Sequence, residues 1–266
     1  MIRRWHRLAS AGLALSLCLL AGAALARSGE ALPETIERVR PSVVGVGTHQ
    51  PTANPQVDFH GTGFAVEDGR AVITNNHVLP AAIDGERRER LVVLAGDPGE
   101  PDLREARIVM RSESSDLAVL RISGPPLPAL QPGEPGRLRP GNRVAFTGFP
   151  IGMILGFHPV THTAMISART PLTLPARRSS ELDSRHIARL RRGDPPMVFQ
   201  LDGTAYPGNS GSPVYDPQTG EVYAVLNQVY VQGGREAAIQ EPSGISYAVP
   251  FDLAEPLLER YRQRHR

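Results

Sequence analysis

This chain of 266 residues has one cysteine, no lysine and no long apolar run, and each of these features excludes some classes of protein. Cysteine occurs once, at Cys18, so no disulfide can form within the chain. Lysine is absent, and arginine supplies all 29 basic residues. These are nearly balanced by 27 acids, which gives a formal net charge of +2 and no support for a nucleic-acid partner. The apolar run at residues 8–20 is shorter than the span of about 20 residues that a membrane-crossing helix needs.

The first 26 residues have the pattern of a secretory signal. A head with three arginines precedes the apolar run, and residues 24–26 (Ala-Leu-Ala) form a small-x-small cleavage site. A membrane anchor is the alternative, but the run is short and ends in small residues. Because Leu17 precedes Cys18, where a lipoprotein signal has a small residue, lipidation is not expected. We predict export to the periplasm or the outside of a bacterial cell, no membrane contact after cleavage, and a formal charge of −1.

Beyond the signal, short apolar or alternating runs are separated by Gly, Pro and Asp turns. This pattern is typical of an all-β barrel or sandwich. A stretch rich in proline and glycine divides the runs into two sets, and Leu253, Leu257 and Tyr261 recur at helical spacing near the end. The predicted units are a signal peptide at 1–26, an N-terminal barrel at 34–125, a linker at 126–141, a C-terminal barrel at 142–250 and a helix at 251–266.

A candidate nucleophile lies in residues 207–213, which read PGNSGSP and place Ser210 in a tight turn. A serine hydroxyl attacks a carbonyl only when a positioned base takes its proton. Small flanking residues let the carbonyl approach and leave backbone N–H groups free to stabilise the charge that develops. The same composition is common in ordinary turns. The interpretation therefore depends on a base and an acid elsewhere in the chain.

His77 and Asp116 provide such candidates. His77 follows the apolar run 71–74 in a polar turn, where an imidazole can take and return a proton; the alternative is a partly buried histidine at a strand end. Asp116 precedes the alternating run 117–122, where a buried carboxylate needs a partner; the alternative is an aspartate that caps a strand. The order His77, Asp116, Ser210 is the chymotrypsin-type order and differs from those of subtilisins and α/β-hydrolases.

The chain resembles bacterial trypsin-like serine proteases, in particular the protease domain of the HtrA (Deg) family. The resemblance implies an all-β, chymotrypsin-like fold of two six-stranded antiparallel β-barrels with a C-terminal helix, and an active site in the cleft between the barrels. The PDZ domains that follow most HtrA protease domains are not expected here. The matching segments are residues 36–44, 61–64, 74–78, 116–120, 148–152, 207–211 and 244–250.

Carried over by position, the resemblance implies that His77 is the general base, Asp116 its orienting acid and Ser210 the nucleophile. The backbone N–H groups of Gly208 and Ser210 would form the oxyanion hole. Asn209 stands where digestive proteases have an aspartate that pairs with a newly cut N-terminus, so that route of activation is not expected. The implied activity is cleavage of exposed or unfolded polypeptides through an acyl-enzyme, without a cofactor or metal.

The substrate pocket departs from both related patterns. Ser212 replaces the second glycine of the HtrA motif and resembles the glutamyl endopeptidase branch, but residues 223–228 lack the histidine that would hold a glutamate. Thr204 at the pocket base argues against Arg or Lys specificity, so we predict a small or medium apolar side chain before the cut. The predicted substrate-binding residues are Thr204, Tyr206, Leu226, Asn227 and Tyr247.

Two other functions fit the same motifs. One is a binding or chaperone module that keeps the protease fold without turnover, and the other is an acyl ester hydrolase on the same barrels. The arginine-rich segment 169–196 is expected to be a solvated loop or short surface helix, and we consider a gating role for it. The sequence predicts no oligomeric state.

Overall fold

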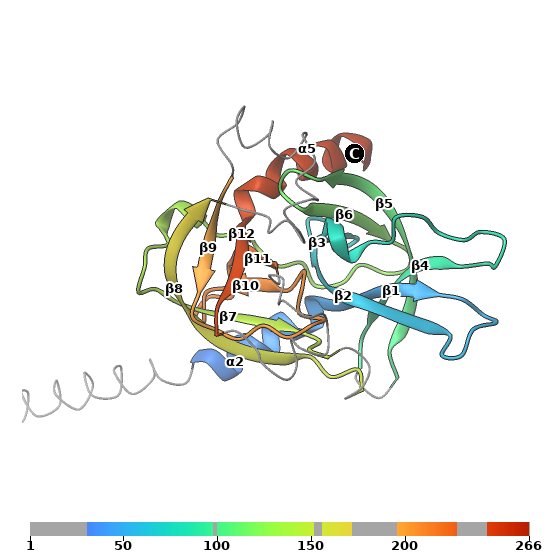
Figure 1. Cartoon of the computed structure of the whole chain (residues 1–266), viewed down its shortest axis with the longest axis horizontal. Coiled ribbons are helices and arrows are strands. Elements are labelled where there is room, and N and C mark those ends of the chain that lie inside the picture. Colours follow the sequence, from blue (N-terminus) through green and yellow to red (C-terminus); the bar gives the residue numbers. More distant parts are fainter. Residues whose placement is uncertain (1–30, 98–99, 152–155, 172–195, 228–243, 266) are drawn as a thin grey trace, which may run out of the picture.

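Two closed barrels of six antiparallel strands each make up most of the described part of the chain (Figure 1). The computed structural model describes residues 31–97, 100–151, 156–171, 196–227 and 244–265. It confirms the all-β fold of two six-stranded barrels that the sequence predicts. The predicted signal peptide lies outside the described residues, as does most of the arginine-rich segment 169–196.

The first barrel has the strand order β1-β2-β3-β6-β5-β4. Alternate residues of its strands face two different apolar cores, because successive side chains of a strand point to opposite faces. Val72 and Leu120 face the barrel interior, whereas Ile73 and Val119 face outward into a second core. The strands are β1 (Val43–His49), β2 (Val57–Val66), β3 (Ala71–Asn75), β4 (Arg90–Ala95), β5 (Asp102–Ser112) and β6 (Leu117–Ile122).

The second barrel follows the order β10-β11-β12-β9-β8-β7 and repeats this arrangement. Phe146, Phe199 and Leu201 fill its interior and are completely buried. The strands are β7 (Arg143–Gly148), β8 (Val160–Pro171), β9 (Met197–Leu201), β10 (Pro213–Tyr215), β11 (Val222–Asn227) and β12 (Ser246–Pro250).

A shared apolar core joins the two barrels. It contains Phe64 and Ile73 of the first barrel, Val225 of the second, and Phe251 and Tyr261 near the C-terminus. Burying a side chain of this size contributes about 1.5–3 kcal/mol, so the two barrels hold each other in a fixed arrangement. The helical segments are α2 (Ala31–Val39), η3 (Arg40–Ser42), η4 (Asn76–Val78), η5 (Pro135–Arg137), η8 (Phe251–Ala254) and α5 (Glu255–His265). Within the described ranges, no helix is long and apolar enough to cross a membrane.

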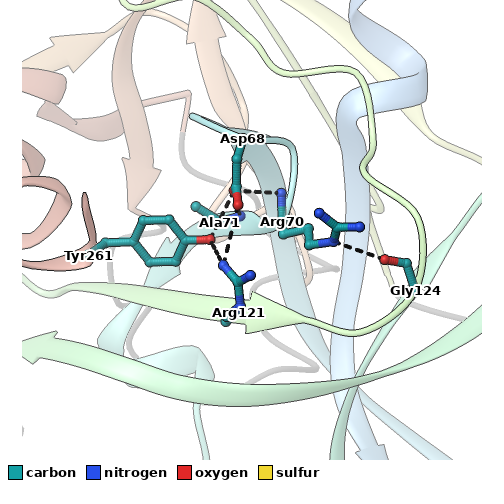
Figure 2. Close-up of polar contacts among 6 residues, drawn as sticks. All are labelled: Asp68, Arg70, Ala71, Arg121, Gly124 and Tyr261. Atoms are coloured by element: carbon teal, nitrogen blue, oxygen red, sulfur yellow. Dashed lines mark hydrogen bonds and ion pairs between the residues drawn. The ribbon is translucent and has the colours of Figure 1, made fainter. Parts of the chain in front are cut away.

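A polar cluster fastens α5 to the first barrel, although the helix follows the second barrel in the chain (Figure 2). The Tyr261 hydroxyl donates to Asp68 Oδ1 at 2.9 Å, and the same oxygen accepts the backbone N–H groups of Arg70 and Ala71 at 3.0 and 3.2 Å. Arg121 of β6 lies 3.3 Å from the other carboxylate oxygen. Burial and the hydrogen bond to Asp68 raise the pKa of the Tyr261 hydroxyl. The cluster therefore links the C-terminal helix α5 to the turn between β2 and β3 of the first barrel.

Candidate active site

Strand pairing brings His77 and Asp116 together. β3 and β6 are neighbours, and their register sets Asn75 opposite Leu117. The residues that follow β3 therefore lie beside the residue that precedes β6. The His77 Nδ1 atom is 2.5 Å from Asp116 Oδ2, and the His77 backbone N–H donates to Asp116 Oδ1 at 2.9 Å. Since a carboxylate accepts, Nδ1 carries the hydrogen, and the other ring nitrogen is left to accept a proton.

The backbone and carboxylate of Asp116 are held from several directions. Its φ of 51° is in the left-handed region, which aspartate tolerates better than most residues. Its carbonyl accepts the Asn75 side-chain amide at 3.1 Å and the Asn76 N–H at 3.0 Å. Asn227 of β11 adds a third donor to the carboxylate, from Nδ2 to Oδ2 at 2.8 Å. These hydrogen bonds compensate the burial of the Asp116 side chain, which is only 11% exposed.

Ser210 lies in the loop between β9 and β10, which is clamped by both barrels. The Ser210 carbonyl accepts the Thr62 N–H of β2 at 2.8 Å, and the Gly208 carbonyl accepts the Thr62 hydroxyl at 2.7 Å. On the other side, the Gly211 N–H donates to Leu226 of β11 at 2.8 Å. Gly211 has a φ of 91°, and a Cβ there would lie 1.9 Å from the Thr62 carbonyl oxygen. Only glycine fits this position.

The serine loop lies close to η4, the turn of residues 76–78 that carries His77 and is called the histidine turn below. Both contact Gly61 of β2. A Cβ on Gly61 would lie 3.0 Å from the Ser210 carbonyl oxygen and 2.8 Å from Val78, the residue after His77. The structure thus brings His77, Asp116 and Ser210 to the junction of the barrels, where β3 and β11 lie side by side (Figure 1). Among the described residues, the Ser210 hydroxyl makes no direct hydrogen bond to His77. Such a contact commonly tightens when substrate binds.

The N–H groups of Gly208 and Ser210 donate to no acceptor among the described residues. The Pro207 carbonyl accepts the Ile151 N–H at 2.6 Å. Because the C=O and N–H of a trans peptide point in opposite directions, this bond turns the Gly208 N–H away from Ile151. Ile151 has a φ of 61°, which is strained for a β-branched residue and costs about 1–3 kcal/mol. Backbone strain is therefore stored where the serine loop is anchored.

Two polar side chains of the serine loop itself are completely buried. The amide of Asn209 and the hydroxyl of Ser212 have no hydrogen-bond partner among the described residues. An unpaired buried polar group costs about 1–3 kcal/mol. A Cβ on Gly148 of β7 would lie 2.0 Å from Ser212 Oγ and 2.9 Å from Asn209 Oδ1. Gly148 therefore leaves the space that these two side chains occupy.

Residues 61–225 match the sequence pattern of a protein family described as the trypsin-like peptidase domain. The chain belongs to this family. A "Probable periplasmic serine endoprotease DegP-like" of Hahella chejuensis is 30% identical over 204 residues, which cover 76% of this chain and 35% of that protein. A protein of the same description from a Marinomonas species is 28% identical over 216 residues, which cover 81% and 38%. The chain thus spans about a third of the length of these curated relatives.

Solved structures of HtrA-type proteases share the fold of this trypsin-like peptidase. The "HtrA-type protease AlgW with decapeptide" has a TM-score of 0.60 at 22% identity, covering 85% of this chain and 65% of that one. The same protease with a tripeptide has a TM-score of 0.60 at 24% identity, covering 86% and 62%. The resemblance to the HtrA family that the sequence suggests is confirmed.

The five predicted pocket residues of this trypsin-like peptidase differ from one another in burial and in what they contact. Thr204 and Tyr206 are half-buried in the segment before Ser210, and Tyr247 of β12 packs against the core between the barrels. Leu226 is completely buried in the interior of the second barrel. Asn227 contacts Asp116, a contact that the sequence reasoning did not identify.

One histidine that the sequence reasoning passed over lies beside the pocket segment. The His162 ring stacks on Phe146 at a centroid distance of 5.0 Å, and the Tyr206 ring is 6.2 Å away. Burial lowers the pKa of His162. Its position in β8, opposite Phe146, depends on strand pairing and has no local sequence signal.

No group of three or more His, Cys, Asp or Glu residues in the described ranges could hold a metal ion.

Proposed function

We propose that the chain is an exported serine endopeptidase that cleaves polypeptides through an acyl-enzyme at Ser210. The observation that supports it best is the His77–Asp116 pair, in which Nδ1 and Oδ2 are 2.5 Å apart, beside a serine loop whose Gly208 and Ser210 N–H groups have no acceptor in the described part of the chain. A base, an acid that fixes its orientation and donors for a developing negative charge are the parts that acyl transfer from a peptide needs.

In the proposed reaction, the Ser210 Oγ atom attacks the substrate carbonyl while His77 Nε2 takes the hydroxyl proton. The hydrogen on Nδ1 stays with the imidazole and donates to Asp116, which stabilises the imidazolium. The N–H groups of Gly208 and Ser210 bind the oxyanion, and each such donor contributes about 10²–10³ in rate. His77 then gives its proton to the leaving nitrogen as the C–N bond breaks. Water, activated by the same imidazole, hydrolyses the acyl ester and regenerates Ser210.

The acyl half of the substrate would lie toward the second barrel. We propose that Thr204, Tyr206 and Tyr247 shape its pocket. Leu226, which the sequence also predicts there, is buried in the interior of the second barrel and supports the pocket from behind, and the side chain of Asn227 is engaged by Asp116. Ser246 packs close to this pocket and donates its hydroxyl to the Gly203 carbonyl. Thr204 supplies no charge at the base, so we propose that a small or medium apolar side chain precedes the cut.

We further propose that the protein acts in the periplasm or outside the cell. The pattern of the first 26 residues supports this location, and so do the relatives, which are named periplasmic endoproteases. Exposed or unfolded polypeptides are the proposed substrates.

Labelling with a fluorophosphonate, which reacts with activated serines, tests the proposal together with casein cleavage. We expect wild type to be labelled and to cleave casein, and both Ser210→Ala and His77→Ala to lose both signals. Ser123→Ala, at an exposed position after β6, is the matched control and should behave as wild type. If folded wild-type protein showed neither signal, the chain would be a binding module of the same fold. Labelling and ester hydrolysis without peptide cleavage would identify an acyl ester hydrolase.

A further inference from the structure

A β-bulge in β2 places His60 beside the proposed active site. In the pairing of β1 with β2, Val46 lies opposite Gly61 and Gly47 lies opposite Phe59. His60 is therefore the extra residue of the bulge and has no partner in β1. Bulges occur often near active sites, where they redirect a side chain.

The His60 imidazole connects the histidine turn to an exposed acid. Its Nδ1 lies 3.2 Å from the carbonyl oxygen of Val78, the residue after His77. Its Nε2 lies 3.3 Å from Asp58 Oδ2. The His60 side chain is 20% exposed, whereas that of Asp58 is 81% exposed. The pair thus presents a carboxylate to solvent at a position fixed by the turn that holds His77.

The same stretch of β2 borders the serine loop. Thr62 donates its N–H to Ser210 and accepts the Thr74 hydroxyl with its carbonyl, so its backbone groups point away from β1. Gly61, between His60 and Thr62, also borders this loop, since a Cβ there would lie 3.0 Å from the Ser210 carbonyl oxygen. The stretch from His60 to Thr62 therefore runs along the serine loop.

The chemistry indicates which half of a substrate passes here. His77 protonates the leaving nitrogen, so the leaving half of the peptide lies on the side of the histidine turn. The acyl half lies toward the second barrel, where Thr204 and Tyr247 are placed in the proposed pocket. His60 belongs to the first barrel and contacts the histidine turn, so the leaving half must run past it and past Asp58.

We propose that Asp58 and His60 form a subsite for the leaving half of a polypeptide substrate and select a basic side chain within two residues after the cut. This inference rests on the proposed endopeptidase function. Among the described residues, His60 is the only side chain within ion-pair distance of Asp58, and the exposed carboxylate is accessible to an arginine or lysine of the substrate. His60 holds this carboxylate beside the cleavage site, and an acidic side chain at the same place would be repelled.

The test uses two internally quenched peptides that carry a sequence cleaved in casein and differ only in the two residues after the cut, both arginine in one peptide and both glutamate in the other. For wild type we expect kcat/KM to be about fivefold higher for the arginine peptide, the size of effect that exposed charge pairs produce. Asp58→Asn should bring the ratio close to one, and Asp58→Arg should invert it.

Glu105→Gln is the matched control, because Glu105 is also an exposed acid in an ion pair, with Arg90. It lies on β5, across the first barrel from β2 (Figure 1), and should leave the ratio at the wild-type value. Fluorophosphonate labelling involves no leaving peptide and reports for each variant whether Ser210 is reactive. A wild-type ratio in labelled Asp58→Asn and Asp58→Arg overturns the subsite. Wild-type protein without labelling or cleavage would instead overturn the proposed function, and the subsite with it.

Discussion

Asp116→Asn is the substitution that tests the proposed orientation of His77 most sharply. It replaces one carboxylate oxygen by an NH₂ group with almost no change of shape. The φ of 51° at this position is tolerated by asparagine as well as by aspartate, so we expect the backbone to stay in place. Three donors converge on the two carboxylate oxygens: the N–H of His77 on Oδ1, and the ring Nδ1 of His77 with the amide of Asn227 on Oδ2.

An amide offers one oxygen to these three donors, so each of its two orientations leaves a conflict. With NH₂ at the Oδ2 position, it faces the ring of His77 and the amide of Asn227. The ring must then accept at Nδ1 and carry its hydrogen on Nε2, where it blocks transfer of the serine proton. With NH₂ at the Oδ1 position, it faces the backbone N–H of His77 and leaves a buried donor unpaired. That costs about 1–3 kcal/mol of stability.

We expect kcat for a peptide substrate to fall by about 10⁴, which is the loss seen when the acid of such a triad becomes an amide. This corresponds to about 5 kcal/mol in the activation barrier. Steady-state kinetics give the loss, thermal unfolding gives the cost in stability, and nitrogen-15 NMR of the imidazole reports which ring nitrogen carries the hydrogen. Asp252→Asn, at an exposed acid in η8, is the control. A folded Asp116→Asn protein with its hydrogen on Nδ1 and less than a tenfold loss of kcat would refute the reasoning.

Two further predictions concern the surroundings of the serine loop. Gly148→Ala adds a Cβ 2.0 Å from Ser212 Oγ, and overpacking of this kind costs about 1–3 kcal/mol; urea unfolding and fluorophosphonate labelling should both show the loss. Gly136→Ala, where a Cβ meets nothing within 4 Å, should be neutral in both measurements. Because burial lowers the pKa of His162 from its usual 6.5, the unfolded chain binds more protons than the folded one as the pH falls through 6.5. Between pH 7 and 5, the free energy of unfolding of His162→Gln should therefore fall by less than that of wild type. Denaturant titrations at both pH values measure this, and equal losses in the two proteins would contradict a lowered pKa of His162.

The sequence locates His77 and Asp116 well, because both lie at ends of strands with clear apolar patterns. The strand β3 ends at Asn75 and the strand β6 begins at Leu117, close to the predicted limits. Once these two strands pair in an antiparallel barrel, the residues beyond their ends must come together. Local pattern and barrel topology are thus sufficient for this part of the site.

The bulge at His60 could not be predicted in the same way. Its side chain is placed by a mismatch between two strands, Val46 opposite Gly61 and Gly47 opposite Phe59, and neither strand alone carries a signal of it. The clamp of the serine loop by Thr62 likewise depends on how one barrel meets the other. Contacts of this kind follow from packing between segments far apart in the chain.

Asn227 is different, because alternation along β11 does contain a signal for it. Leu226 faces the interior of the second barrel, and Val225 faces the core shared with the first barrel. With a period of two, Asn227 falls on the same face as Val225, where an apolar residue would be expected. A polar side chain on a buried face needs a hydrogen-bond partner. The strand β11 of the second barrel lies beside β3 of the first, and the buried carboxylate of Asp116 is within reach there, so the amide of Asn227 links the serine-bearing barrel to the acid of the other.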